Sequence, residues 1–253
     1  VMTDLNALYD VLDGPLAVRS SSLLEDSHYQ PFAGVYSTYM VPHFADRQRT
    51  IRLLADAVKG VYASVFFADS KAYMVATRNV IDQEKMAVII QEAVGQQHAN
   101  HFYPSFAGVG RSLNYYPVGD ELPADGVAEV AVGLGKYIVD GGMALRFSPR
   151  HPSHVLQTST IDLALRDTQR YFYALSTNVP QQDFSIDEGF DIERLRVDDA
   201  AKQGHLKYLV STYDYQNDRL VDTDEGMGRK VVTFANVLQH GVFPLAQSLA
   251  FML

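Results

Sequence analysis

Apolar and polar positions change period several times along the chain, which is typical of a protein built from both helices and strands. From Asp46 to Arg78, apolar residues recur every three or four positions. This spacing predicts one long helix with Asp46 as its N-cap and Gly60 as a weak interior point. A second helix is predicted from Gly126 to Val139, and a last one begins at Pro244.

Strands are predicted where short apolar runs or alternating patterns lie between turn-forming residues. These segments are Leu16 to Val18, Val35 to Pro42, Met86 to Ile90 and Phe102 to Tyr116. Three more segments are candidates for either sheet or helix: Tyr171 to Ser176, Tyr208 to Tyr215 and Val231 to Leu253. They do not alternate strictly with helices, so the predicted fold class is α+β. Because the chain has neither an internal repeat nor a linker rich in Pro, Gly and Ser, residues 1–253 are predicted to form a single domain.

Composition excludes several classes of protein. Hydrophobic residues make up 47% of the chain and charged residues 20%, which excludes an intrinsically disordered protein. The absence of cysteine excludes disulfides, thiolate metal sites and a cysteine nucleophile, and it suits a reducing cytoplasm. A net charge of -9 argues against a broad nucleic-acid surface but permits a local anion pocket. Charged and polar residues interrupt every long apolar stretch, so no membrane partner is expected.

The segment LAVRSSSLLEDSHYQPFAGVYSTY, residues 16–39, combines residue types that bind phosphate groups. Arg19 lies at the end of the predicted strand, and Ser20 to Ser22 are predicted to form a polar loop after it. A guanidinium group offers paired N–H donors to phosphate oxygens, and serines add hydroxyl and backbone donors. Gly34 allows the backbone to approach a polyphosphate closely.

A second interpretation of Arg19 stays open on these residues alone. An arginine at the end of a strand commonly pairs with nearby carboxylates, and Glu25 and Asp26 follow it closely. In that case its role is structural. The two interpretations differ in whether the guanidinium group is available to a ligand.

The whole segment resembles the nucleotide-binding domain of the phosphoenolpyruvate synthase and pyruvate phosphate dikinase family, in which VRSSAxxED is followed by a short spacer and FAGxxxT. The residues that match at the same offsets are Val18, Arg19, Ser20, Ser21, Glu25, Asp26, Phe32, Ala33, Gly34 and Thr38. Weaker matches follow in the family's order: VIIQEAVG with Gln91, FAGVGRS from Phe106, GLGKYIVDGGMALRF from Gly133 and, more loosely, VVTFANVL from Val231.

The resemblance implies an ATP-grasp-like fold, in which two α+β lobes surround a nucleotide cleft. It implies that Arg19 contacts the ATP phosphates and that small residues surround them, namely Ser20, Ser21, Ser22, Gly34 and Thr38. Among the other cations, Arg111 is the best candidate to line the same cleft, because it lies on a strand that the family uses for this purpose.

The adenine end of the nucleotide is also implied by the resemblance. In the family, a strand that ends in Gln forms the hinge between the lobes. Gln91, together with the backbone of Glu92 and Ala93, is therefore the implied adenine contact. Arg19 and Gln91 are expected to face one cleft.

The sequence departs from the family pattern in several places. Leu23 and Leu24 stand where smaller residues are usual, and Ala107 replaces a serine. The family's phosphate-binding Lys segment does not fit into the eighteen residues before Arg19, and its metal-binding acidic strand follows the point at which this chain ends. We therefore expect a domain truncated at both ends and inactive alone, with ATP as its ligand and Mg²⁺ bound only in a longer protein.

Three hypotheses about function follow. The chain is the ATP-binding domain of a cytoplasmic dikinase-type phosphotransferase, a kinase that passes a phosphoryl group from ATP to a histidine on another domain. Its partners would then be the nucleotide and the phosphohistidine and phosphoenolpyruvate/pyruvate domains of the parent chain. Alternatively, it is a degenerate nucleotide-sensing regulatory module, or a non-catalytic interaction scaffold.

Two other groups of residues are interpreted as surface features. The segment from Asp191 to Leu195 lies among many charged neighbours, which favours a solvated face over a substitute acidic motif. The pairs His98 with His101 and His151 with His154 have a spacing compatible with metal binding, but neither has an obvious third ligand. No metal site is predicted.

Overall fold

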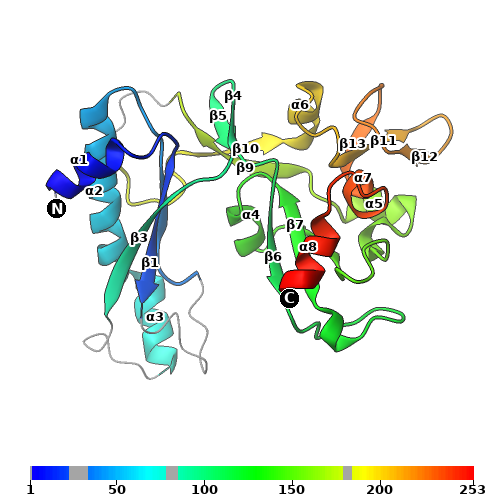
Figure 1. Cartoon of the computed structure of the whole chain (residues 1–253), viewed down its shortest axis with the longest axis horizontal. Coiled ribbons are helices and arrows are strands. Elements are labelled where there is room, and N and C mark those ends of the chain that lie inside the picture. The colour runs from blue at the N-terminus through cyan, green and yellow to red at the C-terminus, as the bar shows by residue number, and fades with distance from the viewer. Residues whose placement is uncertain (1, 23–33, 78–84, 179–183) are drawn as a thin grey trace. The chain divides into compact units, whose positions relative to one another are not determined.

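The computed structural model describes residues 2–22, 34–77, 85–178 and 184–253 (Figure 1). The chain divides into two compact units, which are described separately. Unit 1 is Val1–Phe102 with Leu175–Glu193, and unit 2 is Tyr103–Ala174 with Arg194–Leu253. Helices and antiparallel strand pairs occur together, which confirms the α+β class. The ATP-grasp-like arrangement of two lobes stays a prediction.

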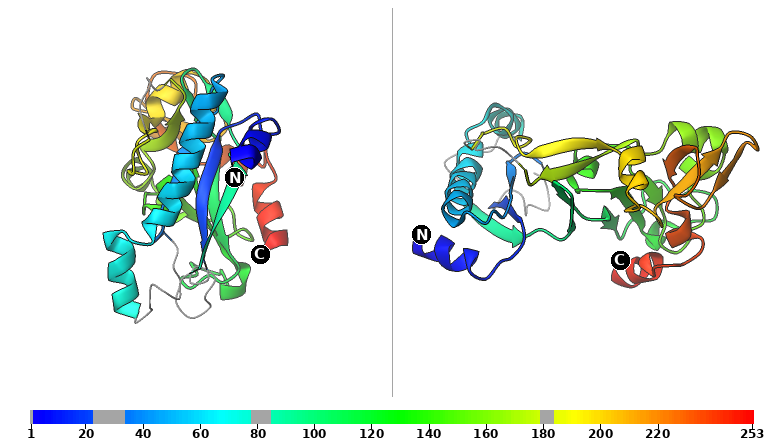
Figure 2. Two further views of the ribbon diagram at one scale, coloured as in Figure 1. Left: turned by 90° about the vertical axis from the view of Figure 1, so that its left-hand side faces the viewer. Right: turned by 90° about the horizontal axis from the view of Figure 1, so that it is seen from above.

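Unit 1 is built around the three-stranded sheet β2-β1-β3. Its elements are α1 (Met2–Tyr9), β1 (Leu16–Ser22), β2 (Thr38–Val41), α2 (Arg47–Ser64), α3 (Ala68–Thr77), β3 (Met86–Glu92) and β4 (Gln96–His98). Leu16 and Val18 of β1 are buried together with Leu54, Ala57 and Val61 of α2. Figures 1 and 2 show α2 lying along the sheet. Because α2 packs on one side of the sheet, the side chains on the other side are not part of this core.

The helix predicted from Asp46 to Arg78 is two helices, α2 and α3, and Arg78 lies outside the described residues. The predicted N-cap is confirmed, since the Asp46 side chain accepts a hydrogen bond from the Arg49 backbone N–H at 3.1 Å. The first helix ends at Ser64 because other groups take the Ser64 carbonyl. It accepts from the Phe67 N–H at 3.1 Å and from the Ser70 hydroxyl at 2.7 Å. These bonds turn the chain between α2 and α3.

Unit 2 contains the sheets β6-β7-β8 and β12-β11-β13. Its elements are β6 (Phe106–Arg111), β7 (Val127–Val132), α4 (Lys136–Val139), β8 (Leu145–Phe147), α5 (Ile161–Arg166), α6 (Val197–Lys202), β11 (Val210–Asp214), β12 (Arg219–Val221), β13 (Arg229–Val232), α7 (Ala235–Leu238) and α8 (Leu245–Met252). A further sheet, β10-β9-β5-β4, adds β5 (His101–Tyr103), β9 (Tyr171–Ser176) and β10 (Ile192–Arg196), and its strands contain the boundaries between the units. Of the described helices, none is long and apolar enough to cross a membrane.

The helix predicted from Gly126 to Val139 is wrong over most of its length. Val127–Val132 is strand β7, which pairs with β6 on one side and β8 on the other, and only α4 is helical. At Gly133 the backbone has φ +83°, and a Cβ there would lie 2.6 Å from the Phe172 ring and 2.7 Å from the Tyr173 carbonyl oxygen. Glycine is therefore required where the chain leaves β7.

Candidate functional site

Four of the predicted nucleotide-binding residues, Arg19, Ser21, Thr38 and Gln91, meet on one side of the unit 1 sheet. Residues of β1 alternate between the core and the opposite side, and Arg19 is exposed on the latter. Its cross-strand neighbours are Thr38 and Ile89, and Gln91 lies opposite Ala17. Directly opposed residues of an antiparallel pair share a face. We call this side of the sheet the open face; its residues are Ala17, Arg19, Ser21, Thr38, Met40, Ala87, Ile89 and Gln91.

Arg19 occupies the middle strand of the open face. Thr38 on one side supplies a hydroxyl group, and Ile89 on the other, 43% exposed, supplies an apolar surface. Among the described residues no carboxylate forms an ion pair with Arg19. Glu25 and Asp26, on which the structural interpretation of Arg19 depends, lie outside the described residues, as do Phe32 and Ala33 of the motif. The described surroundings of Arg19 suit an anionic ligand.

The serines after Arg19 are part of β1, so the polar loop predicted there is wrong. They pair with β3, and the alternation of the strand turns Ser20 and Ser22 toward the core, where they are 5% and 2% exposed. Only Ser21 of the three lies on the open face. Gly34 has φ +79° in the turn before β2, a conformation that favours glycine. The predicted row of three hydroxyl donors is therefore reduced to one.

The proposed adenine contact lies at the end of the edge strand β3. The Ala93 N–H donates to the Pro15 carbonyl at 2.8 Å, so this donor is unavailable to a base, contrary to expectation. In an antiparallel pair, successive residues of a strand point their backbone N–H and C=O groups alternately toward and away from the partner strand. Ala93 points toward β1, so its neighbour Glu92 points away from β1. The N–H and C=O of Glu92 thus point to the free edge of the sheet. The Glu92 carboxylate accepts from the Gly14 N–H at 2.9 Å, which anchors this strand end.

Comparison with known families identifies the kind of domain to which these residues belong. Residues 1–187 of the 253 match the family described as "Pyruvate phosphate dikinase, AMP/ATP-binding domain". The chain belongs to this family. The matched segment contains the whole open face of this AMP/ATP-binding domain. A search of curated proteins returned no match.

Arg111 of the AMP/ATP-binding domain lies at the end of β6, where it is exposed and pairs with Val127. It belongs to unit 2, whereas Arg19 and Gln91 belong to unit 1. Its predicted contribution to the nucleotide site therefore stays a prediction.

The solvated face predicted from Asp191 to Leu195 is wrong for Asp191. This residue is 4% exposed, and its Oδ1 atom has no hydrogen-bond partner among the described residues. Burial raises the pKa of Asp191 to about 6, against the opposing effect of the Arg49 charge. Glu193 is exposed, as predicted, and lies 2.9 Å from the His101 Nε2 atom. Because most of its neighbours in the sequence are charged, the sequence pattern wrongly indicates that Asp191 is exposed.

The histidines of the HPSH segment have a third potential ligand that the sequence did not reveal. Single donor atoms of Asp120, His151 and His154 lie within 4.8 Å of one another. Each imidazole already has a carboxylate partner, since His154 lies 3.4 Å from Asp120 and His151 lies 3.2 Å from Asp125. Asp120 and His154 are also exposed. These contacts account for the group, and we assign no metal to it.

Proposed function

We propose that the open face binds ATP, with Arg19 at the phosphates and Gln91 and the backbone of Glu92 at the adenine. The observation that supports this most is that Arg19, Thr38 and Gln91 share one face on adjacent strands. Arg19 and Gln91 are diagonal neighbours, and such residues are typically about 7–8 Å apart, with their Cβ atoms somewhat closer. Both side chains are long, so their polar ends can lie farther apart than the Cβ atoms and contact opposite ends of one nucleotide.

As far as the structure describes it, the open face supplies hydrogen-bond donors for phosphate groups but no carboxylate ligands for a metal. Arg19 supplies a permanent positive charge with paired N–H donors, and Ser21 and Thr38 supply hydroxyl groups beside it. The described residues of this face include no carboxylate, and Mg²⁺ prefers carboxylate oxygens. The face by itself therefore does not fit a Mg²⁺ site, and we derive no step through this metal.

Within a complete protein, we propose that the domain supplies ATP for phosphoryl transfer to a histidine on another domain. The family match supports this role, because the family is the nucleotide-binding domain of a dikinase. A regulatory nucleotide sensor would bind the same ligands without turnover. An interaction scaffold would bind none, so a thermal-shift titration with ATP, ADP and AMP separates it from the other two.

The test of the site is calorimetric binding of ADP and of adenosine to the Arg19→Ala variant. Loss of a charge-assisted contact to phosphate should remove roughly 1.5–3 kcal/mol, a ten- to hundred-fold weaker ADP affinity. Adenosine affinity should not change, because adenosine has no phosphate. Gln91→Ala should instead weaken both ligands.

Arg52→Ala is the matched control, because Arg52 is an exposed arginine of the same unit on α2, which covers the other side of the sheet. It should leave both affinities unchanged. If Arg19→Ala binds ADP as well as the unmodified chain but unfolds at lower urea concentration, Arg19 is a structural residue and the assignment fails.

A further inference from the structure

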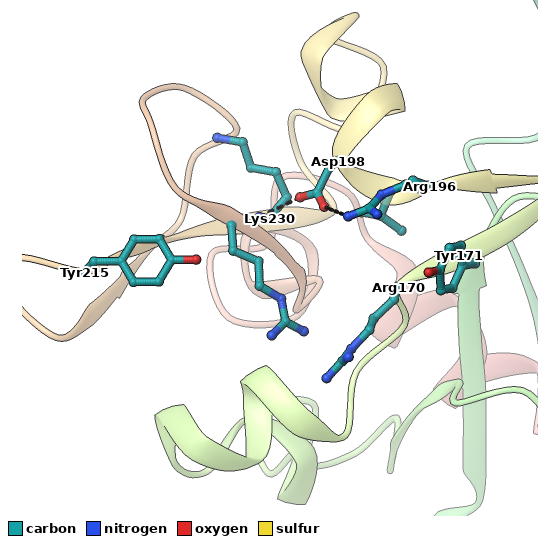
Figure 3. A pocket seen from close by; sticks show the side chains of 8 residues that line it. Arg170, Tyr171, Arg196, Asp198, Tyr215 and Lys230 are labelled. Atoms are coloured by element: carbon teal, nitrogen blue, oxygen red, sulfur yellow. Dashed lines mark hydrogen bonds and ion pairs between the residues drawn. The ribbon is translucent and has the colours of Figure 1, made fainter.

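Unit 2 contains a concentration of positive charge formed by residues that do not belong to the open face. It lies in a cavity of about 520 Å³ (Figure 3). The lining residues are Arg170, Tyr171, Arg196, Val197, Asp198, Tyr215, Arg229 and Lys230. Four positive groups against one carboxylate leave this lining with a net charge of +3, in a chain whose net charge is -9. Positive groups held close together repel one another, so this local excess of positive charge is unfavourable unless an anion binds there.

Arg170 and Arg229 hold their guanidinium groups close together. Both donate from Nη2 to the Leu165 carbonyl near the end of α5, at 3.2 and 2.6 Å. The two Nη2 atoms are therefore no more than about 5.8 Å apart. Neither guanidinium has a carboxylate hydrogen-bond partner among the described residues. Burial and the charge of Arg170 lower the pKa of Arg229, which is the expected effect of a like charge nearby.

The other charged groups of the cavity offset this repulsion only in part: the charge of Asp198 favours charged Arg229, but less than burial and the charge of Arg170 disfavour it. Asp198 accepts from Arg196 at 3.2 Å and from the Lys230 backbone N–H at 3.1 Å, and Figure 3 shows it between these two residues. The Lys230 ammonium group donates to the Thr212 hydroxyl at 2.7 Å and to the Gly226 carbonyl at 3.1 Å. One guanidinium group is sufficient for the Leu165 carbonyl. The second adds repulsion, and the carboxylate of Asp198, which opposes it, is hydrogen-bonded to Arg196 and the Lys230 backbone instead of to either guanidinium group.

We propose that this cavity binds the phosphate group of a small phosphate ester, with Arg170 and Arg229 as its main contacts. Two adjacent guanidinium groups present N–H donors in a planar arrangement that suits phosphate oxygens. A dianion between them replaces their mutual repulsion with two attractions. The cavity is larger than one phosphate group and falls within the range of small-molecule sites. The organic part of the ester lies against Tyr171 and Tyr215, which line the same cavity.

The test measures calorimetric binding of glucose 6-phosphate, inorganic phosphate and glucose to the 253-residue chain at low salt. Glucose 6-phosphate should bind more tightly than inorganic phosphate, and glucose should not bind. Arg170→Gln and Arg229→Gln should each weaken glucose 6-phosphate binding at least tenfold. Arg219→Gln removes an exposed arginine that pairs with Asp214 outside the cavity, and it should bind normally. Arg19→Ala should also bind normally, which separates this site from the open face.

Stability distinguishes a ligand site from a purely structural role. Arg170→Gln should leave the free energy of unfolding unchanged or raise it, because it relieves the repulsion on Arg229. Arg170→Lys keeps the charge but removes the planar group, and it should weaken binding in a folded protein. Absence of phosphate-ester binding by the unmodified chain overturns the proposal. So does an Arg170→Gln variant that is less stable yet binds normally, and equal affinity for phosphate and its ester overturns the contact with the tyrosines.

Discussion

The burial of Asp191 leads to a prediction about how the stability of the protein depends on pH. Its carboxyl group is 4% exposed, its Oδ1 atom lacks a partner among the described residues, and burial raises its pKa from 3.8 to about 6. The folded state therefore binds this proton more tightly than the unfolded state does. Protonated Asp191 is compatible with the fold, whereas ionised Asp191 is not well solvated. Stability should fall as pH rises from about 4 to above 6.

The size of the effect follows from the displacement of the pKa. Each pKa unit corresponds to about 1.36 kcal/mol, so a change from 3.8 to about 6 is worth about 3 kcal/mol in full. Most of this, about 2 to 3 kcal/mol, should be lost between about pH 4 and pH 8. Asp191→Asn keeps the shape of the side chain and removes the titration. The difference in stability between this variant and the unmodified chain should then change by the same amount across that range.

The assay is urea unfolding of both proteins at several pH values. Comparing the change with pH, instead of the stability at one pH, cancels the fixed cost of burying an amide in place of a carboxyl. Asp199→Asn removes an exposed carboxylate and serves as the charge control, which should not reproduce the effect. Stability curves for Asp191→Asn and the unmodified chain that stay parallel from about pH 4 to pH 8 would refute the reasoning.

Two further predictions concern the fold and are measured by urea unfolding at one pH. Gly133→Ala should cost roughly 2 kcal/mol or more, because the added Cβ meets Phe172 and the Tyr173 carbonyl in addition to an unfavourable φ. Gly119→Ala also has a positive φ but meets nothing within 4 Å, so a loss as large as that of Gly133→Ala would contradict the steric argument. Asp46→Ala should cost about 1 kcal/mol by removing the N-cap of α2, and an unchanged stability would show that the cap contributes nothing.

Local sequence patterns predicted an element correctly where its structure depends mainly on its own residues. The strands β2 and β3 lie within or around their predicted segments, and the segment from Tyr171 to Ser176, predicted as either sheet or helix, is β9 with the same limits. The N-cap at Asp46 and the start of the last helix after Pro244 are also confirmed. Capping and strand alternation act over a few residues, so the sequence alone carries them.

Other features required contacts between residues far apart in the chain. Val127–Val132 is a strand because β6 and β8 pair with it on both sides, although its composition also suits a helix. The break after Ser64 depends on the Ser70 hydroxyl, and Asp191 is buried where it feels the charge of Arg49, a residue far from it in the chain. Propensity is too weak to decide such cases against tertiary packing.

The nucleotide-binding motif shows the same division within one short segment. The sequence determined which residues carry the phosphate chemistry, because Arg19 and its small neighbours form a recognisable string. The tertiary structure decided which of them share a face. Ser20 and Ser22 are turned into the core by strand alternation, while Thr38 and Gln91 join Arg19 from neighbouring strands. Strand pairing sets this selection, and residue types alone do not specify pairing register.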